Sequence, residues 1–199
     1  MAGQYNISTI VRKIGPRAAE ALVPLLSIDE IVIKHAAELI RKVNDPKANE
    51  KASEHLAREL LANVPKIKEG HLVAAATIGG DAIASALLKL ATDATLSAGL
   101  QRFALRAYSD GLAKKVIKPS AKQIDALFTM SESSEYDQYQ REETYYVIAQ
   151  AGRVEDIPRI KKLLQSKSSF WRAVGFRCIL RIDGENQLEG TLREIARSR

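Results

Sequence analysis

Residues 154–182 read VEDIPRIKKLLQSKSSFWRAVGFRCILRI and contain two apolar stripes at helical spacing. The first stripe uses positions 154, 157, 160, 163 and 164, and the second uses 171, 174, 178 and 182. Apolar residues three and four positions apart lie on one face of an α-helix. Helices this short are not stable alone and must bury the stripe against a neighbour. The stretch therefore predicts a pair of packed helices joined by a short turn.

The same pattern of helix, turn and helix recurs along the chain. Each unit opens near a turn-forming residue, and these residues are Gly15, Asn44, Gly79, Pro119, Gly152 and Gly184. A basic residue recurs early in the second helix of each unit, at Lys34, Lys68, Arg102, Arg141 and Arg172. Both landmarks are spaced by roughly 30 to 40 residues, which is typical of a repeat protein. We expect one domain over residues 1–199, with helix pairs at about 15–43, 44–78, 79–111, 112–151 and 152–183 and a half-repeat at 184–199.

Two of these units carry a further motif. Residues 21–27 (ALVPLLS) precede residues 34–40 (KHAAELI), and residues 156–164 (DIPRIKKLL) precede Arg-Ala-Val at 172–174. A proline inside the first helix, a basic residue early in the second and a Gly/Asp turn after it are similar to the HEAT and HEAT-like repeat family, including the shorter units of phycobilin lyases. The resemblance implies an all-α solenoid, or superhelix, of about five to six antiparallel helix pairs. In such solenoids the second helices line a concave surface that can bind a partner.

Local signals support the helix boundaries. Ser120 with Gln123 predicts a capping box, and Gly152 and Gly184 follow expected helix ends, where a left-handed residue is favoured. Residues 29–33 are β-branched, but they lead directly into a stronger helical pattern. We therefore expect a helix there and almost no strand in the chain.

Composition places the chain among ordinary soluble proteins, with 46% hydrophobic and 27% charged residues. Cys178 is the single cysteine, so an intramolecular disulfide is excluded and a reducing, cytoplasmic location is expected. No apolar run is long enough for export or for membrane insertion. His35, His55 and His71 are isolated from one another, and no nucleotide-binding or nucleophile motif is present. We expect no metal, no cofactor and no enzymatic activity.

Charge suggests where a partner could bind. The net charge of +6 makes an acidic protein or a nucleic acid plausible. If the second helices line a concave face, they could present a basic strip, whose members would be Lys34, Arg41, Arg102, Arg106, Arg141, Arg172, Arg177 and Arg181. The alternative is that these are separate surface charges paired with neighbouring carboxylates.

Residues 131–146 form a second candidate site because they contain four of the six tyrosines. Tyr136 and Tyr139 are predicted to lie on a binding loop in the longest unit, since insertions in repeat proteins often line a binding edge. The alternative is an ordinary loop with Tyr145 and Tyr146 in the core. Trp171 has the same two interpretations, of which core packing is favoured, and Gly79-Gly80 is interpreted as a turn rather than an anion site.

The leading functional prediction is a protein-binding scaffold or adaptor. A nucleic-acid-binding protein is the first alternative, because alkylpurine DNA glycosylases resemble the same repeat architecture and use a basic concave face. A subunit similar to tetrapyrrole lyases or their chaperones is a further alternative, and it rests on the resemblance alone.

Overall fold

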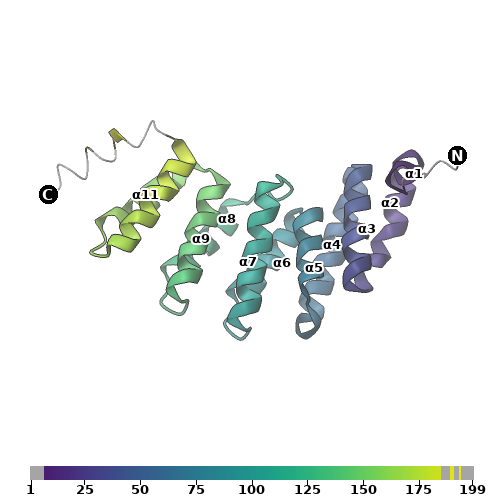
Figure 1. The fold of residues 1–199 in the computed structure, drawn as a ribbon, viewed down its shortest axis with the longest axis horizontal. Helices are drawn as coiled ribbons and strands as arrows, with labels where there is room; N and C mark the ends of the chain where they lie inside the picture. The colour runs from purple at the N-terminus through teal and green to yellow at the C-terminus, as the bar shows by residue number, and fades with distance from the viewer. Residues whose placement is uncertain (1–6, 185–188, 191–192, 194–199) are drawn as a thin grey trace, which may run out of the picture. The chain divides into compact units, whose positions relative to one another are not determined.

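The computed structural model describes residues 7–184, 189–190 and 193. These residues form α-helices and short 3-10 helices, and no strand occurs among them, which confirms the all-α class (Figure 1). None of the helices in this described part is both long and apolar enough to cross a membrane. Most of the half-repeat expected at 184–199 falls outside the described residues. The chain divides into two compact units, Met1–Lys118 and Pro119–Arg199.

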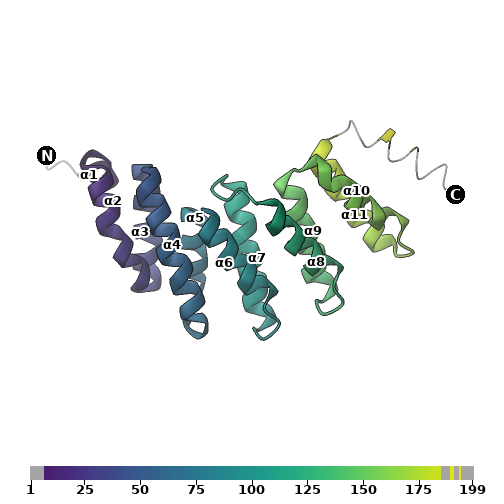
Figure 2. The same cartoon turned by 180° about the vertical axis from the view of Figure 1, so that it is seen from behind.

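The first unit contains seven α-helices in its described part. They are α1 (Ile7–Ile14), α2 (Pro16–Leu22), α3 (Glu30–Val43), α4 (Pro46–Ala62), α5 (Glu69–Ile78), α6 (Asp81–Thr92) and α7 (Ala98–Ala113). Helices α3, α5 and α7 pack side by side in one layer, and α2, α4 and α6 form the other (Figures 1 and 2). The core between the layers is built from fully buried side chains such as Ile33, Leu56, Leu87 and Leu105.

The second unit contains two further helix pairs. They are α8 (Ala121–Glu132) with α9 (Gln138–Ala151), and α10 (Ile157–Lys161) with α11 (Ser169–Asp183). Helix α9 packs against both α8 and α11. Phe128, Val174 and Cys178 are fully buried between these helices, and the Tyr145 side chain is 4% exposed.

The helix pairs can be compared directly with the expected units. Helices α2 and α3 lie within 15–43, α4 and α5 within 44–78, α8 and α9 within 112–151, and α10 and α11 within 152–183. Helix α7 runs to Ala113, two residues past the expected boundary at 111. That these pairs belong to one HEAT-like domain stays a prediction.

The predicted helix boundaries follow from local hydrogen bonds. Asp29 caps α3 by accepting hydrogen bonds from the backbone N–H groups of Ile31 and Val32. This cap stabilises the start of the helix, so the β-branched residues at 31–33 are helical. The capping box of Ser120 and Gln123 is confirmed. Gly152 is also confirmed as a left-handed residue at the end of α9, with φ of 70°.

Tyr108 on α7 provides a first test of this core. Its side chain is fully buried, and within the described residues its hydroxyl has no hydrogen-bond partner. Burial raises the pKa of Tyr108 far above its usual range, so the hydroxyl remains neutral. Because an unsatisfied buried hydroxyl is costly, we expect Tyr108→Phe to raise the free energy of unfolding by about 1 kcal/mol in urea titrations.

The matched control is Tyr145→Phe. The Tyr145 hydroxyl hydrogen-bonds with Ser131, so its removal should lower the free energy of unfolding. A loss of stability in Tyr108→Phe as large as that in Tyr145→Phe would show that the Tyr108 hydroxyl does make a hydrogen bond.

Candidate protein-binding surface

Side chains near the start of three second helices reach back to the end of the preceding helix. Arg141 donates through Nε to the carbonyl of Ser131 at 2.8 Å. Arg172 donates through Nη1 to the carbonyls of Ser166 and Lys167, at 2.8 and 2.9 Å. Gln101 makes the equivalent contact in α7, from Nε2 to the carbonyl of Asp93 at 2.6 Å. These contacts satisfy carbonyls that a helix end leaves open.

This arrangement corrects the basic landmark seen in the sequence. The equivalent of Arg141 and Arg172 in α7 is Gln101, one residue before Arg102. Lys68 precedes the first turn of α5 as its N-terminal cap position, so it does not lie early in the second helix. The recurring feature is therefore a long hydrogen-bond donor that closes the loop, and a positive charge is not required.

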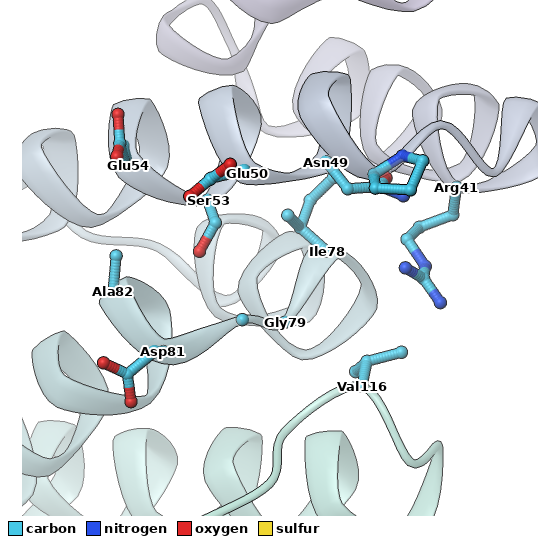
Figure 3. Close-up of a pocket in the computed structure, with 12 residues that line it drawn as sticks. Arg41, Asn49, Glu50, Ser53, Glu54, Ile78, Gly79, Asp81, Ala82 and Val116 are labelled. Carbon is cyan, nitrogen blue, oxygen red and sulfur yellow. The ribbon is translucent and has the colours of Figure 1, made fainter.

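The other members of the expected strip have different surroundings. Lys34 forms an ion pair with Glu30 at 3.4 Å, as the paired-charge alternative predicts. Arg41 lines a cavity beside Val116 (Figure 3). In the second unit, the Arg177 guanidinium lies over the Tyr146 ring at 5.7 Å from its centroid, and Arg181 is exposed. A continuous basic binding strip stays a prediction.

The tyrosine-rich segment is arranged differently from the expectation. Tyr136 lies in the loop between α8 and α9 and is half-buried, whereas Tyr139 is the second residue of α9 and is 70% exposed. The loop at 133–137 has the same length as the loop at 93–97, so it carries no insertion. The extra residues of the longest unit instead form the connection at 114–120, between α7 and α8.

The aromatic residues that follow are mainly packing groups. Tyr145 lies edge-on to Trp171 with ring centroids 6.0 Å apart, and the Arg141 guanidinium covers the same Trp171 ring at 4.8 Å. Cys178 is buried beneath them, and burial raises the pKa of its thiol to about 12. Trp171 thus has the core contacts that the favoured interpretation predicts, although it is only half-buried.

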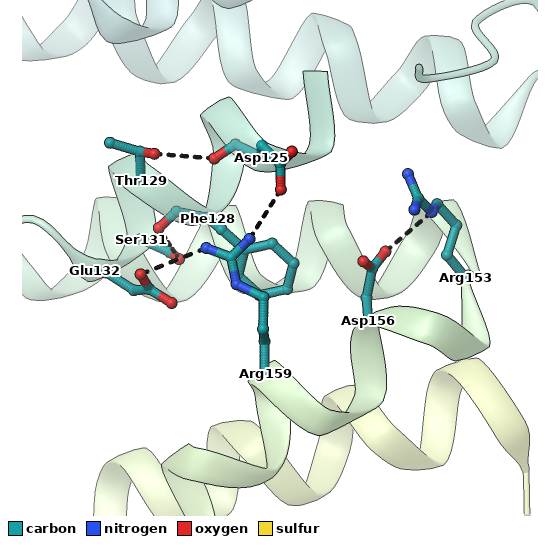
Figure 4. Close-up of polar contacts among 8 residues, drawn as sticks. All are labelled: Asp125, Phe128, Thr129, Ser131, Glu132, Arg153, Asp156 and Arg159. Carbon is teal, nitrogen blue, oxygen red and sulfur yellow. Dashed lines mark hydrogen bonds and ion pairs between the residues drawn. The ribbon is translucent and has the colours of Figure 1, made fainter. Parts of the chain in front are cut away.

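Arg159 of α10, which was not among the predicted site residues, contacts three side chains of α8 (Figure 4). The Arg159 guanidinium lies 3.8 Å from the centroid of the Phe128 ring and forms ion pairs with Asp125 at 3.0 Å and Glu132 at 3.5 Å. Stacking and two carboxylates fix this side chain, so its role is to join the two helices.

Asp156, next to this cluster, gives a prediction of pH dependence. Desolvation raises the pKa of its carboxyl, and Arg153, 3.2 Å away, opposes that shift (Figure 4). A raised pKa in the folded state means that stability is lost as pH rises from the ordinary aspartate value through the raised one. Asp156→Asn should therefore gain stability relative to the wild type between pH 3 and pH 7, measured by urea unfolding.

Glu155→Gln is the control for this measurement, because the Glu155 pKa is lowered by a hydrogen bond to its own backbone and by Arg153. A lowered pKa contributes stability above the ordinary value, and this contribution is lost as pH falls. The relative stability of Glu155→Gln should thus change in the opposite direction. If the free energies of unfolding of the two variants, relative to the wild type, changed with pH in the same direction, the opposite pKa shifts of Asp156 and Glu155 would be wrong.

One surface with features of a binding site lies between α5 and α7. A cleft of about 180 Å³ has an apolar lining of Leu72, Val73, Phe103 and Ala107. Phe103 is 53% exposed and Val73 is 39% exposed, so both present apolar surface to solvent. Large side chains that become desolvated in a well-packed pocket contribute most of the binding energy at protein interfaces.

Three charged residues surround this cleft: Glu69, Arg106 and Asp110. Within residues 7–184, 189–190 and 193, none of their side chains makes an ion pair or hydrogen bond. Both signs of charge are therefore available to a partner. Of the expected strip, Arg106 alone lines this cleft, where two carboxylates outnumber it.

Sequence comparison adds no assignment to this geometry, since the chain matches no protein-family model and no curated protein. In the described part of the chain, no group of three or more His, Cys, Asp or Glu side chains is arranged to hold a metal ion. The fold and the surface define an all-helical protein with an apolar cleft that is rimmed by charges of both signs.

Proposed function

We propose that this chain is a non-catalytic protein-binding scaffold, in which HEAT-like helix pairs form a solenoid and the second helices receive a protein partner. The observation that carries the proposal is the exposed Phe103 beside the α5–α7 cleft, together with the unpaired charges around it. The layering of α3, α5 and α7 supports it, because neighbouring second helices provide an extended surface.

The partner segment carries an apolar side chain flanked by charges of both signs. The apolar side chain fills the cleft between Val73 and Phe103 and removes both from water. A basic group of the partner pairs with Glu69 or Asp110, and an acidic group pairs with Arg106. Charges at the rim of an interface select the partner and its orientation more than they add affinity.

Burial keeps two side chains between α9 and α11 in their neutral forms near neutral pH. Burial raises the pKa of the Cys178 thiol to about 12 and that of the Tyr146 hydroxyl to about 12. A thiolate is the reactive form of cysteine, so Cys178 is unreactive near neutral pH. Both side chains act in packing between α9 and α11.

The proposal is tested by affinity capture from native lysate with the full chain as bait, at low and high salt, with and without nuclease. We expect a protein to be retained after nuclease treatment, and its retention to fall with Arg106→Glu. The control is Arg58→Glu, an exposed arginine on α4 outside the cleft. Retention that disappears with nuclease and falls steeply with salt would instead favour the nucleic-acid alternative.

A further inference from the structure

A second cavity, of about 450 Å³, lies in the first unit between α4 and the junction of α5 with α6 (Figure 3). Its wall includes Asn49 and Ser53 of α4, Gly79 and Asp81 of the junction, and Arg41 of α3. This volume falls within the range of roughly 300 to 1,000 Å³ that is usual for small-ligand sites. No residue lines both this cavity and the α5–α7 cleft, so the inference does not rest on the proposed function.

Two polar atoms in this wall lack hydrogen-bond partners among the described residues. Ser53 is 4% exposed, and its hydroxyl makes no hydrogen bond with a described residue. The side-chain oxygen of Asn49 is also buried and also lacks a described hydrogen-bond partner. The Ser53 side chain points from α4 toward Gly79 and Ala82, into the cavity (Figure 3). Because buried polar atoms are almost always satisfied, these two oxygens are available to a hydrogen-bond donor of a ligand in the cavity.

The backbone at the junction permits this arrangement. Gly80 has φ of 90°, and a Cβ there would lie 2.6 Å from Ser53 Oγ. Its N–H donates to the carbonyl of Val116 at 2.9 Å, which fixes the turn. Glycine at this position therefore allows Ser53 to approach the start of α6 without a clash.

Charge is separated along the cavity. Glu50 and Glu54 lie toward one end with Ser53, and no described cation pairs with either carboxylate (Figure 3). The Arg41 guanidinium lies toward the other end, near Val116, and it is also without an ion pair in the described part of the chain. The wall thus presents acceptors at one end and a donor at the other.

We propose that this cavity binds a ligand that joins a cationic N–H donor group to a carboxylate or carbonyl, as arginine does, either free or as a residue of a peptide. A guanidinium has five N–H donors in a planar fork, which suits the carboxylates of Glu50 and Glu54 and the oxygens of Asn49 and Ser53. The carboxylate or carbonyl of the ligand accepts from Arg41. Each end is then a charge-assisted contact, the stronger kind of hydrogen bond.

Isothermal titration calorimetry of the full chain tests this proposal with three probes. These are L-arginine, an arginine residue in a capped Gly-Arg-Gly peptide, and L-citrulline, which has nearly the same shape but no side-chain charge. We expect saturable binding of at least one arginine probe and none of citrulline at the same concentrations. Tighter binding of the free amino acid identifies a small metabolite as the source, and tighter binding of the peptide identifies a protein segment. Saturation by neither arginine probe, or equal binding of citrulline, would overturn the proposal.

Variants locate the binding within the cavity. The double variant Glu50→Gln/Glu54→Gln should weaken binding of the arginine probe about tenfold or more, because it removes charge-assisted contacts. Glu38→Gln is the control, since Glu38 is an exposed carboxylate on α3 that does not line the cavity. Both carboxylates are exposed, so the double variant should keep the helical circular dichroism of the wild type. Unchanged arginine affinity in the folded double variant would overturn the assignment.

Discussion

Replacing Phe103 with serine is expected to abolish retention of the protein partner while leaving the helices folded. The side chain is 53% exposed, so its loss removes contact surface without opening a hole in the core. Aromatic residues at the centre of an interface contribute roughly 2 kcal/mol or more on truncation, which corresponds to a weakening of about thirtyfold. Quantitative capture and circular dichroism measure the two effects separately.

Ile14→Ser is the matched control for Phe103→Ser. Ile14 is 58% exposed on α1, so it exposes a similar fraction of apolar side chain outside the cleft. Its replacement should leave partner retention unchanged. Equal losses in the two variants would indicate nonspecific adhesion through exposed apolar residues and would remove Phe103 from the binding site.

The largest loss of stability is expected for Gly79→Ala. Gly79 has φ of 68°, and a Cβ there would lie 2.4 Å from the carbonyl oxygen of Val116. An alanine is strained at this φ and must also displace backbone that closes the turn between α5 and α6. We expect the free energy of unfolding of the first unit to fall by about 3 kcal/mol or more in urea titrations.

Gly99→Ala provides the opposite case within the same unit. Gly99 lies in the first turn of α7, and the nearest atom to an added Cβ is 4.0 Å away. Alanine has the higher helix propensity, so this variant should be as stable as the wild type or slightly more stable. If Gly79→Ala were as stable as Gly99→Ala, the close approach of Val116 to the junction would be wrong.

Most of the helix layout follows from short-range patterns. Apolar stripes, the Asp29 cap and the glycine after α9 are local features, and each acts within a few residues. The all-α class could therefore be predicted. The extra residues of the longest unit were placed wrongly, even though the capping box of Asp137 and Gln140 is also a local signal for the start of α9.

The candidate binding surfaces were harder to predict than the helices. Phe103 lies off the buried stripe of α7, but a single apolar residue outside a stripe is common on protein surfaces. Only its neighbours on α5 make it a candidate anchor. The cavity between α4 and the α5–α6 junction is lined by residues as distant in sequence as Arg41 and Val116, so no sequence motif could predict it. The basic landmark was misleading at Arg102, since hydrogen-bond donation rather than charge recurs.

The proposed function depends on a protein partner that binds in the α5–α7 cleft. Its most direct test is photo-crosslinking from a photoreactive phenylalanine analogue placed at Phe103, compared with the same analogue at Ile14. We expect a discrete adduct with one protein from position 103 that resists nuclease and is absent from position 14. No adduct from position 103, the same adducts from both positions, or an adduct removed by nuclease would contradict it.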